Sequence, residues 1–386
     1  MNAAEVLESV QALSAEFSRE RDARRHRREL ASGDFERLRD TGFLLAGVPT
    51  EMGGTWESIP RSTRATCEMV RALARADSSV ALVSAMHPGI LGFWLATPRA
   101  DEPYGGAWEE QRRQVFRIAL DGGWWGTMNS EPGSGGDPAR TRTTARKRPD
   151  GAYLLSGVKQ FASGAGITSY MLTIAIPEGE EKPDLFFVEL RGAPWDGSAG
   201  LELIGPWDGH GMIATQSHGF RFDDFPAVRF AWPGNAAGAT STWSRPQPFI
   251  RCLFTSVCIG ILDVAMATAR KQLAARGPTL RPFEQVEWTR VEMEGWLALQ
   301  AYEGMLRAVE TETDADLCSL KGKTAVAELA ELVTTRLCRV MGGGSYSRSS
   351  PFGFWAQDVR ALGFLRPPWA LAFDYMQQGV VKSMSE

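Results

Sequence analysis

The chain has 386 residues, of which 44% are hydrophobic and 23% charged, and its formal net charge is −4. This length and balance predict two or three globular domains with a sizeable core, and the slightly acidic charge argues against nucleic-acid binding. Five cysteines without a CxxC pair and four scattered histidines argue against a disulfide framework and against a metal site. The acidic N-terminus does not resemble a signal peptide, and the apolar run at 252–262 is shorter than the roughly 20 residues that span a bilayer. We therefore expect a cytoplasmic protein without a membrane span.

The first predicted domain, residues 1–118, is helical. Apolar residues recur there at spacings of three and four, which is the period of a helix with one buried face. The segments with this spacing are Val6–Phe17, Phe35–Leu45, Thr66–Leu73 and Val80–Leu95.

A basic run, Arg19–Arg28, lies inside this helical part. Its arginines are interleaved with acids, so we interpret it as a solvated helix face rather than a binding arm.

The second predicted domain, residues 119–236, has the texture of an antiparallel β domain. Its apolar segments are short, rich in aromatic and aliphatic residues, and separated by Gly, Pro and Asp turns. The clearest are Tyr153–Leu155, Met171–Ile176, Leu185–Leu190 and Gly219–Phe222.

The third predicted domain, residues 237–386, returns to helices. Phe249–Leu273, Phe283–Glu310 and Ala315–Arg339 are each long enough for a bundle helix, and Gly342–Gly344 ends the last of them. The predicted order is thus helices, a small β domain and a helical bundle.

Motifs spread over most of the chain resemble those of the acyl-CoA dehydrogenase superfamily. Each motif is weak alone, but their order is specific. In chain order they are RDTGFLLAGVPTEMGG (39–54), NSEPGSGGD (129–137), LSGVKQFASGAG (155–166), RFDDFPAV (221–228), VMGGGSY (340–346) and FWAQDVRALGF (354–364). The resemblance implies an α+β multidomain fold with an N-terminal helical domain, a central antiparallel β domain and a C-terminal four-helix bundle.

The resemblance also implies a flavin, FAD or FMN, against the second and third motifs. An aromatic face and hydrogen-bonding groups at its polar edge suit such a ring system. The positions that match the family's flavin-contacting residues are Thr127, Met128, Asn129, Ser130, Phe161, Ala162 and Ser163. A tight turn and an edge strand without a ligand is the alternative interpretation of these segments.

The chain departs from the family at the catalytic base. Dehydrogenation of an acyl thioester needs a carboxylate near the proton that is removed. One family position for this glutamate holds Arg366, and the other holds Ile250 before Arg251. An arginine stays protonated and cannot accept a proton at neutral pH. Three nearby acids, Asp358, Glu284 and Glu287, remain candidates for a relocated base.

The chain also departs at the adenine end of the cofactor. The family's Arg-x-x-Phe pattern becomes Arg276-Gly277-Pro278-Thr279, and Arg339 replaces a glutamine before Gly342 and Gly343. Two arginines suit a phosphate or pyrophosphate. The missing aromatic residue brings FMN into consideration beside FAD.

Two enzymatic functions follow from the resemblance. We favour a monooxygenase that uses reduced flavin, supplied by a separate reductase, to hydroxylate a small organic substrate, because members of that branch lack the glutamate and carry a phenylalanine followed by Ser-Gly. Ser163 and Arg366 are its candidate site residues. His87 is another candidate, although a lone histidine in a helix is more often structural.

The alternative is an acyl-CoA or carrier-protein acyl thioester dehydrogenase with a relocated base, in which Arg251 would match a family arginine at the thioester end. A degenerate, non-catalytic flavin-binding member is a third interpretation. For each of them the resemblance implies a homodimer or homotetramer.

Overall fold

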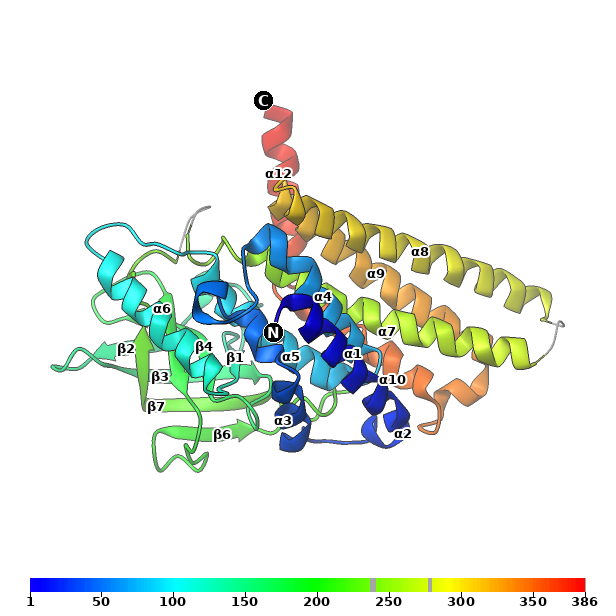
Figure 1. The fold of residues 1–386 in the computed structure, drawn as a ribbon, viewed down its shortest axis with the longest axis horizontal. Coiled ribbons are helices and arrows are strands. Elements are labelled where there is room, and N and C mark those ends of the chain that lie inside the picture. Colours follow the sequence, from blue (N-terminus) through cyan, green and yellow to red (C-terminus); the bar gives the residue numbers. More distant parts are fainter. Residues whose placement is uncertain (237–240, 277–279, 386) are drawn as a thin grey trace.

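The computed structural model of the protein places helices at both ends of the chain and strands in the middle (Figure 1). The structure describes residues 1–236, 241–276 and 280–385. The N-terminal elements are α1 (Ala3–Arg19), α2 (Arg21–Arg24), α3 (Ser32–Asp40), the 3-10 turns η1 (Phe43–Gly47) and η2 (Thr50–Met52), α4 (Ile59–Ala74), α5 (Ser78–Leu95) and α6 (Gly105–Leu120). Three of the four predicted helical segments lie within α1, α4 and α5, whereas Phe35–Leu45 is divided between α3 and η1. The boundary expected at residue 118 falls within the last turn of α6.

The middle strands close into a barrel. β4 pairs with β2 and β5, β7 pairs with β3 and β5, and β3 pairs with β2, so the ring returns to β4. The strands are β1 (Trp125–Thr127), β2 (Thr144–Lys147), β3 (Tyr153–Ala162), β4 (Tyr170–Pro177), β5 (Asp184–Glu189), β6 (Leu201–Gly205) and β7 (His218–Arg229), with the 3-10 turn η3 (Pro138–Arg140) before β2. The expected antiparallel pairing is found for β2 with β3, β3 with β7, β4 with β5, β5 with β7 and β6 with β7, but β1 and β2 both run parallel to β4.

Three long helices follow the barrel. The C-terminal elements are α7 (Gln247–Ala275), α8 (Pro282–Glu310), α9 (Ala315–Met341), the 3-10 turn η4 (Gly343–Tyr346), α10 (Pro351–Asp358), α11 (Ala361–Phe364) and α12 (Trp369–Ser385). The three long helices α7, α8 and α9 extend away from the β strands, as Figure 1 shows. Helix α7 packs against both α9 and the N-terminal α4.

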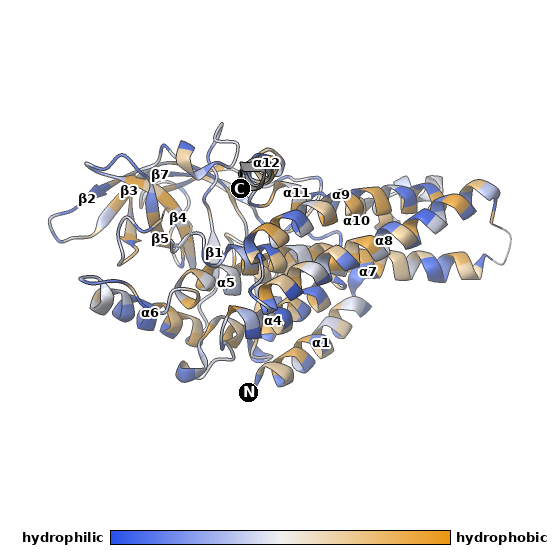
Figure 2. Ribbon diagram, turned by 90° about the horizontal axis from the view of Figure 1, so that it is seen from above, coloured by the Kyte–Doolittle hydropathy of each residue, from blue (hydrophilic) through white to orange (hydrophobic). Residues whose placement is uncertain are grey.

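The two most apolar helices form the centre of the molecule. By length and composition alone, α5 and α7 are apolar enough to cross a membrane, but 94% and 72% of their apolar stretches are buried within the protein. In Figure 2, α5 lies between β1 and α7, and it contacts both. Their hydropathy is therefore accounted for by burial in a core.

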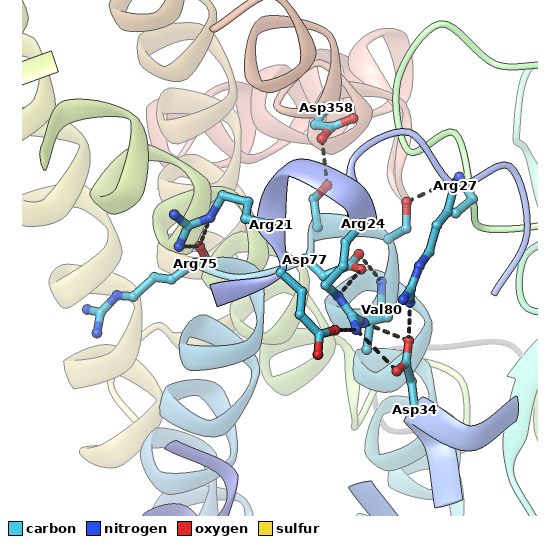
Figure 3. A network of polar contacts seen from close by, with 12 residues as sticks. Arg21, Arg24, Arg27, Asp34, Arg75, Asp77, Val80 and Asp358 are labelled. Atoms are coloured by element: carbon cyan, nitrogen blue, oxygen red, sulfur yellow. Dashed lines mark hydrogen bonds and ion pairs between the residues drawn. The ribbon is translucent and has the colours of Figure 1, made fainter. Parts of the chain in front are cut away.

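The basic run Arg19–Arg28 is not simply a solvated face, so that interpretation is wrong for Arg24. Arg24 is 2% exposed and binds both oxygens of Asp34, at 3.1 and 2.6 Å, and one oxygen of Asp77 at 3.0 Å (Figure 3). Its guanidinium also lies 3.8 Å from the ring centre of Phe17. One buried cation thus joins α1, α2, α3 and the start of α5.

Asp358 extends this polar contact to the C-terminal part of the chain (Figure 3). Its carboxylate accepts hydrogen bonds from Ser78 Oγ at 2.5 Å and from the Met212 backbone N–H at 2.6 Å. Burial raises the pKa of Asp358 to about 6, although both hydrogen bonds act in the opposite direction. The contact holds α10, the start of α5 and the loop before β7 together.

Candidate functional site

A cavity of about 710 Å³ lies where the barrel meets α5, α7 and the C-terminal segment. Ligand sites of this size are concave and mostly apolar, with a few polar groups that orient the ligand. The residues that line it are Leu82, Met86, Gly89, Ile90, Phe93, Thr127, Asn129, Ser130, Glu131, Gly133, Gly135, Gly136, Gln160, Phe161, Ser163, Trp207, His210, Gly211, Met212, Ser217, Trp243, Gln247, Ile250, Phe254, Gln357, Arg360, Ala361, Phe364, Leu365, Arg366 and Pro368.

The two segments that the sequence associates with a flavin meet at this cavity. The backbone N–H of Gln160, near the end of β3, donates to the Ser130 carbonyl at 2.8 Å. This contact joins the loop after β1 to the last residues of β3, although the two are 30 positions apart. Thr127, Asn129, Ser130, Phe161 and Ser163 therefore line one continuous wall.

Phe161 has an unusual backbone conformation at this wall. Its φ of +59° interrupts the pairing of β3 with β7, and such a conformation costs a non-glycine residue about 1–2 kcal/mol. The side chain is 56% exposed and meets Trp207 edge to face, with ring centres 6.2 Å apart. Strain of this kind persists where the surroundings hold it, often beside a ligand.

Hydroxyl groups line the same wall. Ser163 Oγ lies 2.7 Å from Ser217 Oγ, which in turn lies 2.7 Å from Thr215 Oγ1. Asn129 is buried, and among the described residues its Oδ1 has no hydrogen-bond partner. A buried amide oxygen without a partner costs free energy unless a ligand donates to it.

The glycine loop between β1 and β2 contacts the C-terminal segment closely. Gly136 has φ +81°, and a Cβ there would lie 2.8 Å from Pro368 Cγ. Arg366 Nη1 donates to the Gly136 carbonyl at 2.7 Å. Glycine is required here because both the backbone conformation and the close approach exclude a side chain.

The remaining wall is apolar and aromatic. Trp243 and Phe93 pack with ring centres 5.6 Å apart, and Ile250 and Phe254 of α7 complete this end. Water has few polar partners here, so a bound apolar molecule would be well desolvated.

Glu131 is the only carboxylate among the described residues that line the cavity, and it is already paired. Its Oε1 lies 2.7 Å from Lys159 Nζ and 2.7 Å from Thr143 Oγ1, and Oε2 accepts from the Arg142 N–H at 2.8 Å. Burial acts to raise the pKa of Glu131, but the Lys159 charge and these hydrogen bonds outweigh it and lower the pKa. Glu131 is thus an ionised partner of a buried lysine.

The three acids considered for a relocated base lie outside the cavity lining. Asp358 binds Ser78 and Met212, as described above. Glu284 accepts from the Arg281 backbone N–H at 2.8 Å at the start of α8. Glu287 is buried and pairs with Arg336 at 2.9 Å. Each carboxylate has a local structural role.

His87 was a candidate catalytic residue, and the structure argues against that role. Its side chain is fully buried and does not line the cavity. Nδ1 accepts from the Trp125 backbone N–H at 3.2 Å, so the proton is on Nε2, which donates to the Leu44 carbonyl at 3.3 Å. Burial lowers the pKa of His87 to about 3.

Arg251 also lies away from the cavity lining. It is 6% exposed and its Nη1 binds Asp316 Oδ1 at 2.6 Å and Ser319 Oγ at 3.1 Å. Arg251 thus forms an ion pair that joins α7 to α9, and it does not face the cavity.

Other predicted residues lie behind the wall or far from it. Met128 and Ala162 are fully buried and do not line the cavity. Arg339, Gly342 and Gly343 line a separate, open hollow at the end of the bundle away from the barrel (Figure 1), with Phe283 and Cys338. Arg276 is at the same end, where it donates to the Val340 and Met341 carbonyls, while Gly277, Pro278 and Thr279 of that motif lie outside the described residues.

Several cavity residues were missed from the sequence. His210 and Trp207 come from the loop before β7, Trp243 precedes α7, and Arg360 follows α10. The high tryptophan content was the one available signal, since two of the thirteen line this cavity.

Comparisons with known proteins agree with this geometry. Residues 126–225 match the family model "Acyl-CoA dehydrogenase, middle domain". The chain is 26% identical to dibenzothiophene monooxygenase of Mycolicibacterium goodii, over 84% of this chain and 81% of that protein. It is 24% identical to the probable acyl-CoA dehydrogenase FadE25 of Mycobacterium tuberculosis, over 84% and 80%. The crystal structure of FMN-bound TdsC from Paenibacillus sp. A11-2 superposes with a TM-score of 0.79 and 20% identity, over 98% of this chain and 97% of that one.

Proposed function

We propose that this chain, which resembles the acyl-CoA dehydrogenase superfamily in sequence and fold, is a flavin-dependent monooxygenase acting on a small organic substrate. A reduced flavin bound in the cavity would supply two electrons, so that one oxygen atom of dioxygen would enter the substrate and the other would leave as water. The relatives described above include both a monooxygenase and a probable dehydrogenase, so the cavity itself must distinguish the two.

The state of the carboxylates carries the proposal. Dehydrogenation requires a free base within hydrogen-bond reach of the substrate's α-carbon. Among the described residues, only Glu131 brings a carboxylate to the cavity, and Lys159, Thr143 and two backbone N–H groups occupy its oxygens. Oxygenation has no need of such a base.

The residues of the polar wall fit a flavin. Asn129 Oδ1 offers an acceptor without a partner, and Ser163 offers a hydroxyl whose orientation is set by Ser217. Phe161 and Trp207 offer aromatic faces beside these groups. Reduced flavin bound there would supply the electrons for oxygen activation. The apolar end with Phe93 and Trp243 excludes water from the substrate.

We propose FMN as the cofactor. Arg339, which was expected to hold the phosphate end of FAD, lines a hollow separate from the main cavity, and Arg276 donates to the Val340 and Met341 carbonyls at the same end of the bundle. FMN lacks the adenosine portion that would have to reach such a distant site.

The dehydrogenase remains the second candidate because of the similarity to FadE25. The position of Arg251, paired with Asp316 instead of facing the cavity, weighs against it. The protonated Arg366 at the family's glutamate position weighs against it too.

The test combines flavin binding with isotope incorporation. We expect the protein to bind FMN and, with chemically reduced FMN, indole or 3-phenylpropionate and isotopically labelled dioxygen, to give a product with one labelled oxygen by mass spectrometry. Ser163→Ala should weaken FMN binding roughly 2- to 10-fold because one hydrogen bond is lost. The exposed Ser198→Ala, in the loop before β6, is the matched control.

Two outcomes would contradict the proposal. Anaerobic bleaching of protein-bound FAD by octanoyl-CoA would support the dehydrogenase. Failure to bind either flavin would exclude a flavin-dependent enzyme and the non-catalytic flavin-binding member alike.

We further propose a cytoplasmic homodimer or homotetramer that receives reduced flavin from a separate reductase. Exposed apolar side chains on α8, namely Phe283, Met293 and Trp296, support an interface between copies.

A further inference from the structure

A cation without a carboxylate partner lies in the cavity. Arg366 lines the cavity, and among the described residues it forms no ion pair. Its Nη1 donates a hydrogen bond to the Gly136 carbonyl at 2.7 Å. Burial lowers the pKa of Arg366 to about 10, while nearby Tyr375, Asp137 and Glu131 act to raise it, so the group is protonated at neutral pH. Desolvating a charge is costly unless a partner of opposite charge arrives.

Arg366 is held at both ends of its own backbone. Lys323 of α9 is 2% exposed, and its Nζ donates to the Leu365 carbonyl at 2.9 Å and to the Pro367 carbonyl at 2.7 Å. These carbonyls flank Arg366 on either side. A buried lysine therefore anchors the turn from which the arginine extends into the cavity.

The guanidinium lies between the glycine loop, where it donates to Gly136, and the apolar end of the cavity. Its central carbon lies 6.0 Å from the ring centre of Trp243, and Trp243 packs against Phe93 of α5. The hydroxyl groups of Ser163 and Ser217, by contrast, lie on the wall that Phe161 and Trp207 share. The cation is thus associated with the side of the cavity where an apolar substrate would pack.

We propose that the substrate of this enzyme is an apolar or aromatic molecule with a carboxylate, which Arg366 binds, and that Lys323 is the positioning residue for Arg366. The inference rests on the proposed function and specifies its substrate class. A guanidinium presents parallel N–H donors that match the two oxygens of a carboxylate. Trp243, Phe93 and Ile250 would contact the apolar part of the same molecule.

The same guanidinium chemistry would also bind a phosphate, so the cofactor is the competing source of the anion. The two sources differ in one measurable way. If Arg366 contacts the FMN phosphate, replacing Arg366 should weaken the binding of FMN but not that of riboflavin, which lacks the phosphate. If Arg366 contacts the substrate, the replacement should leave the ratio of the FMN and riboflavin affinities unchanged.

The experiment compares two probes of the same shape by isothermal titration calorimetry on the FMN-loaded protein. 3-Phenylpropionate carries a carboxylate, and 3-phenylpropanamide is its neutral counterpart. We expect the wild type to bind the carboxylate roughly tenfold or more tightly than the amide, as one charge-assisted pair would give. Arg366→Met should remove this preference and leave the affinities for FMN and for the amide within about twofold.

Arg360→Met is the matched control. Arg360 also lines the cavity, but it is exposed and donates to Gln357 Oε1 at 3.1 Å. The control should keep the preference for the carboxylate. Loss of the preference in Arg360→Met but not in Arg366→Met would overturn the assignment.

Lys323→Met tests the positioning role. We expect it to reduce the carboxylate preference by roughly fivefold or more, because the turn at 365–367 loses two hydrogen bonds, while the amide and FMN still bind. An equal loss of affinity for all three ligands would mean that Lys323 only stabilises the fold.

Further outcomes would overturn the proposal. One is a wild type that shows no preference for the carboxylate, including a wild type that binds neither probe. The other is an Arg366→Met variant in which FMN binding weakens and riboflavin binding does not, which would assign the anion to the cofactor. These binding results do not depend on turnover, so a failure of the monooxygenase proposal would show separately, as absence of labelled product.

Discussion

His87 shows how burial decides the chemistry of a single side chain. Both ring nitrogens contact backbone groups of neighbouring segments, Leu44 and Trp125, and no water can reach the ring. Burial therefore keeps the imidazole neutral, with a pKa of about 3. A residue in this state stabilises the contact between α5, η1 and β1, and cannot serve as a proton donor near neutral pH.

This environment predicts a pH-dependent stability at the residue scale. The folded-state pKa of His87 lies below its ordinary value of 6.5, so below about pH 6.5 the unfolded state binds a proton that the folded state does not. The contribution of the neutral His87 to the free energy of unfolding is therefore at its full value above about pH 6.5, and it decreases as the pH falls. Between about pH 7.5 and about pH 5, the free energy of unfolding should fall by about 2 kcal/mol more in the wild type than in His87→Gln, measured by urea denaturation.

His26→Gln is the control for this measurement, because His26 is partly exposed and packs edge to face on Phe354. It should keep the wild-type pH dependence. An unchanged slope in His87→Gln would contradict the assignment of a buried, neutral imidazole.

At the scale of elements, Arg24 joins helices that apolar contacts alone would leave less constrained. Asp77 caps the start of α5 by accepting from the Val80 N–H at 3.0 Å, and it also binds Arg24 (Figure 3). Asp34 in α3 accepts hydrogen bonds from the two terminal nitrogens of the same guanidinium. The start of α5 is thereby tied to α2 and α3, and α5 supplies Met86, Ile90 and Phe93 to the cavity.

Replacing Arg24 should leave two carboxylates without their buried partner. We expect Arg24→Met to lower the unfolding free energy by about 3–5 kcal/mol, the usual cost of breaking a buried ion pair on one side. Arg28→Met, which removes an exposed pair with Asp208 at 3.2 Å, should cost less than about 1 kcal/mol. Equal losses in the two variants, measured by chemical denaturation, would show that Arg24 contributes no more than a surface charge.

At the scale of the whole molecule, helix α8 carries apolar side chains that the described residues leave exposed. Phe283, Met293 and Trp296 on α8 are 60%, 54% and 59% exposed. Several exposed apolar side chains on one helix are typical of a protein interface. A second copy of the chain is the occupant that we propose for this surface.

The proposed assembly leads to a test in solution. We expect the wild type to be a dimer or tetramer by light scattering, and the double variant Met293→Glu with Trp296→Glu to dissociate, because two charges would be buried at the contact. Gln11→Glu, an exposed change on α1, should leave the assembly intact. A wild type that is monomeric with flavin bound would contradict the proposal.

Local sequence patterns determined the elements of this protein. Periodicity located α1, α4, α5, α7, α8 and α9, because each helix buries one face or is buried almost entirely. Short aromatic-rich segments located β3, β4, β5 and β7. The motifs at 129–137 and 155–166 also identified two segments that meet at the cavity, where the Gln160 backbone N–H donates to the Ser130 carbonyl.

Only the tertiary structure decided which distant side chains share the cavity. Nothing local indicates that Arg366 reaches Gly136, that Lys323 holds the turn around Arg366, or that Trp243 and His210 line the same space. It likewise decided that His87 is inert and that Arg24 is buried. The physical reason is that burial and charge pairing depend on how segments far apart in sequence pack together, whereas the periodicity of a helix or strand depends on its own residues.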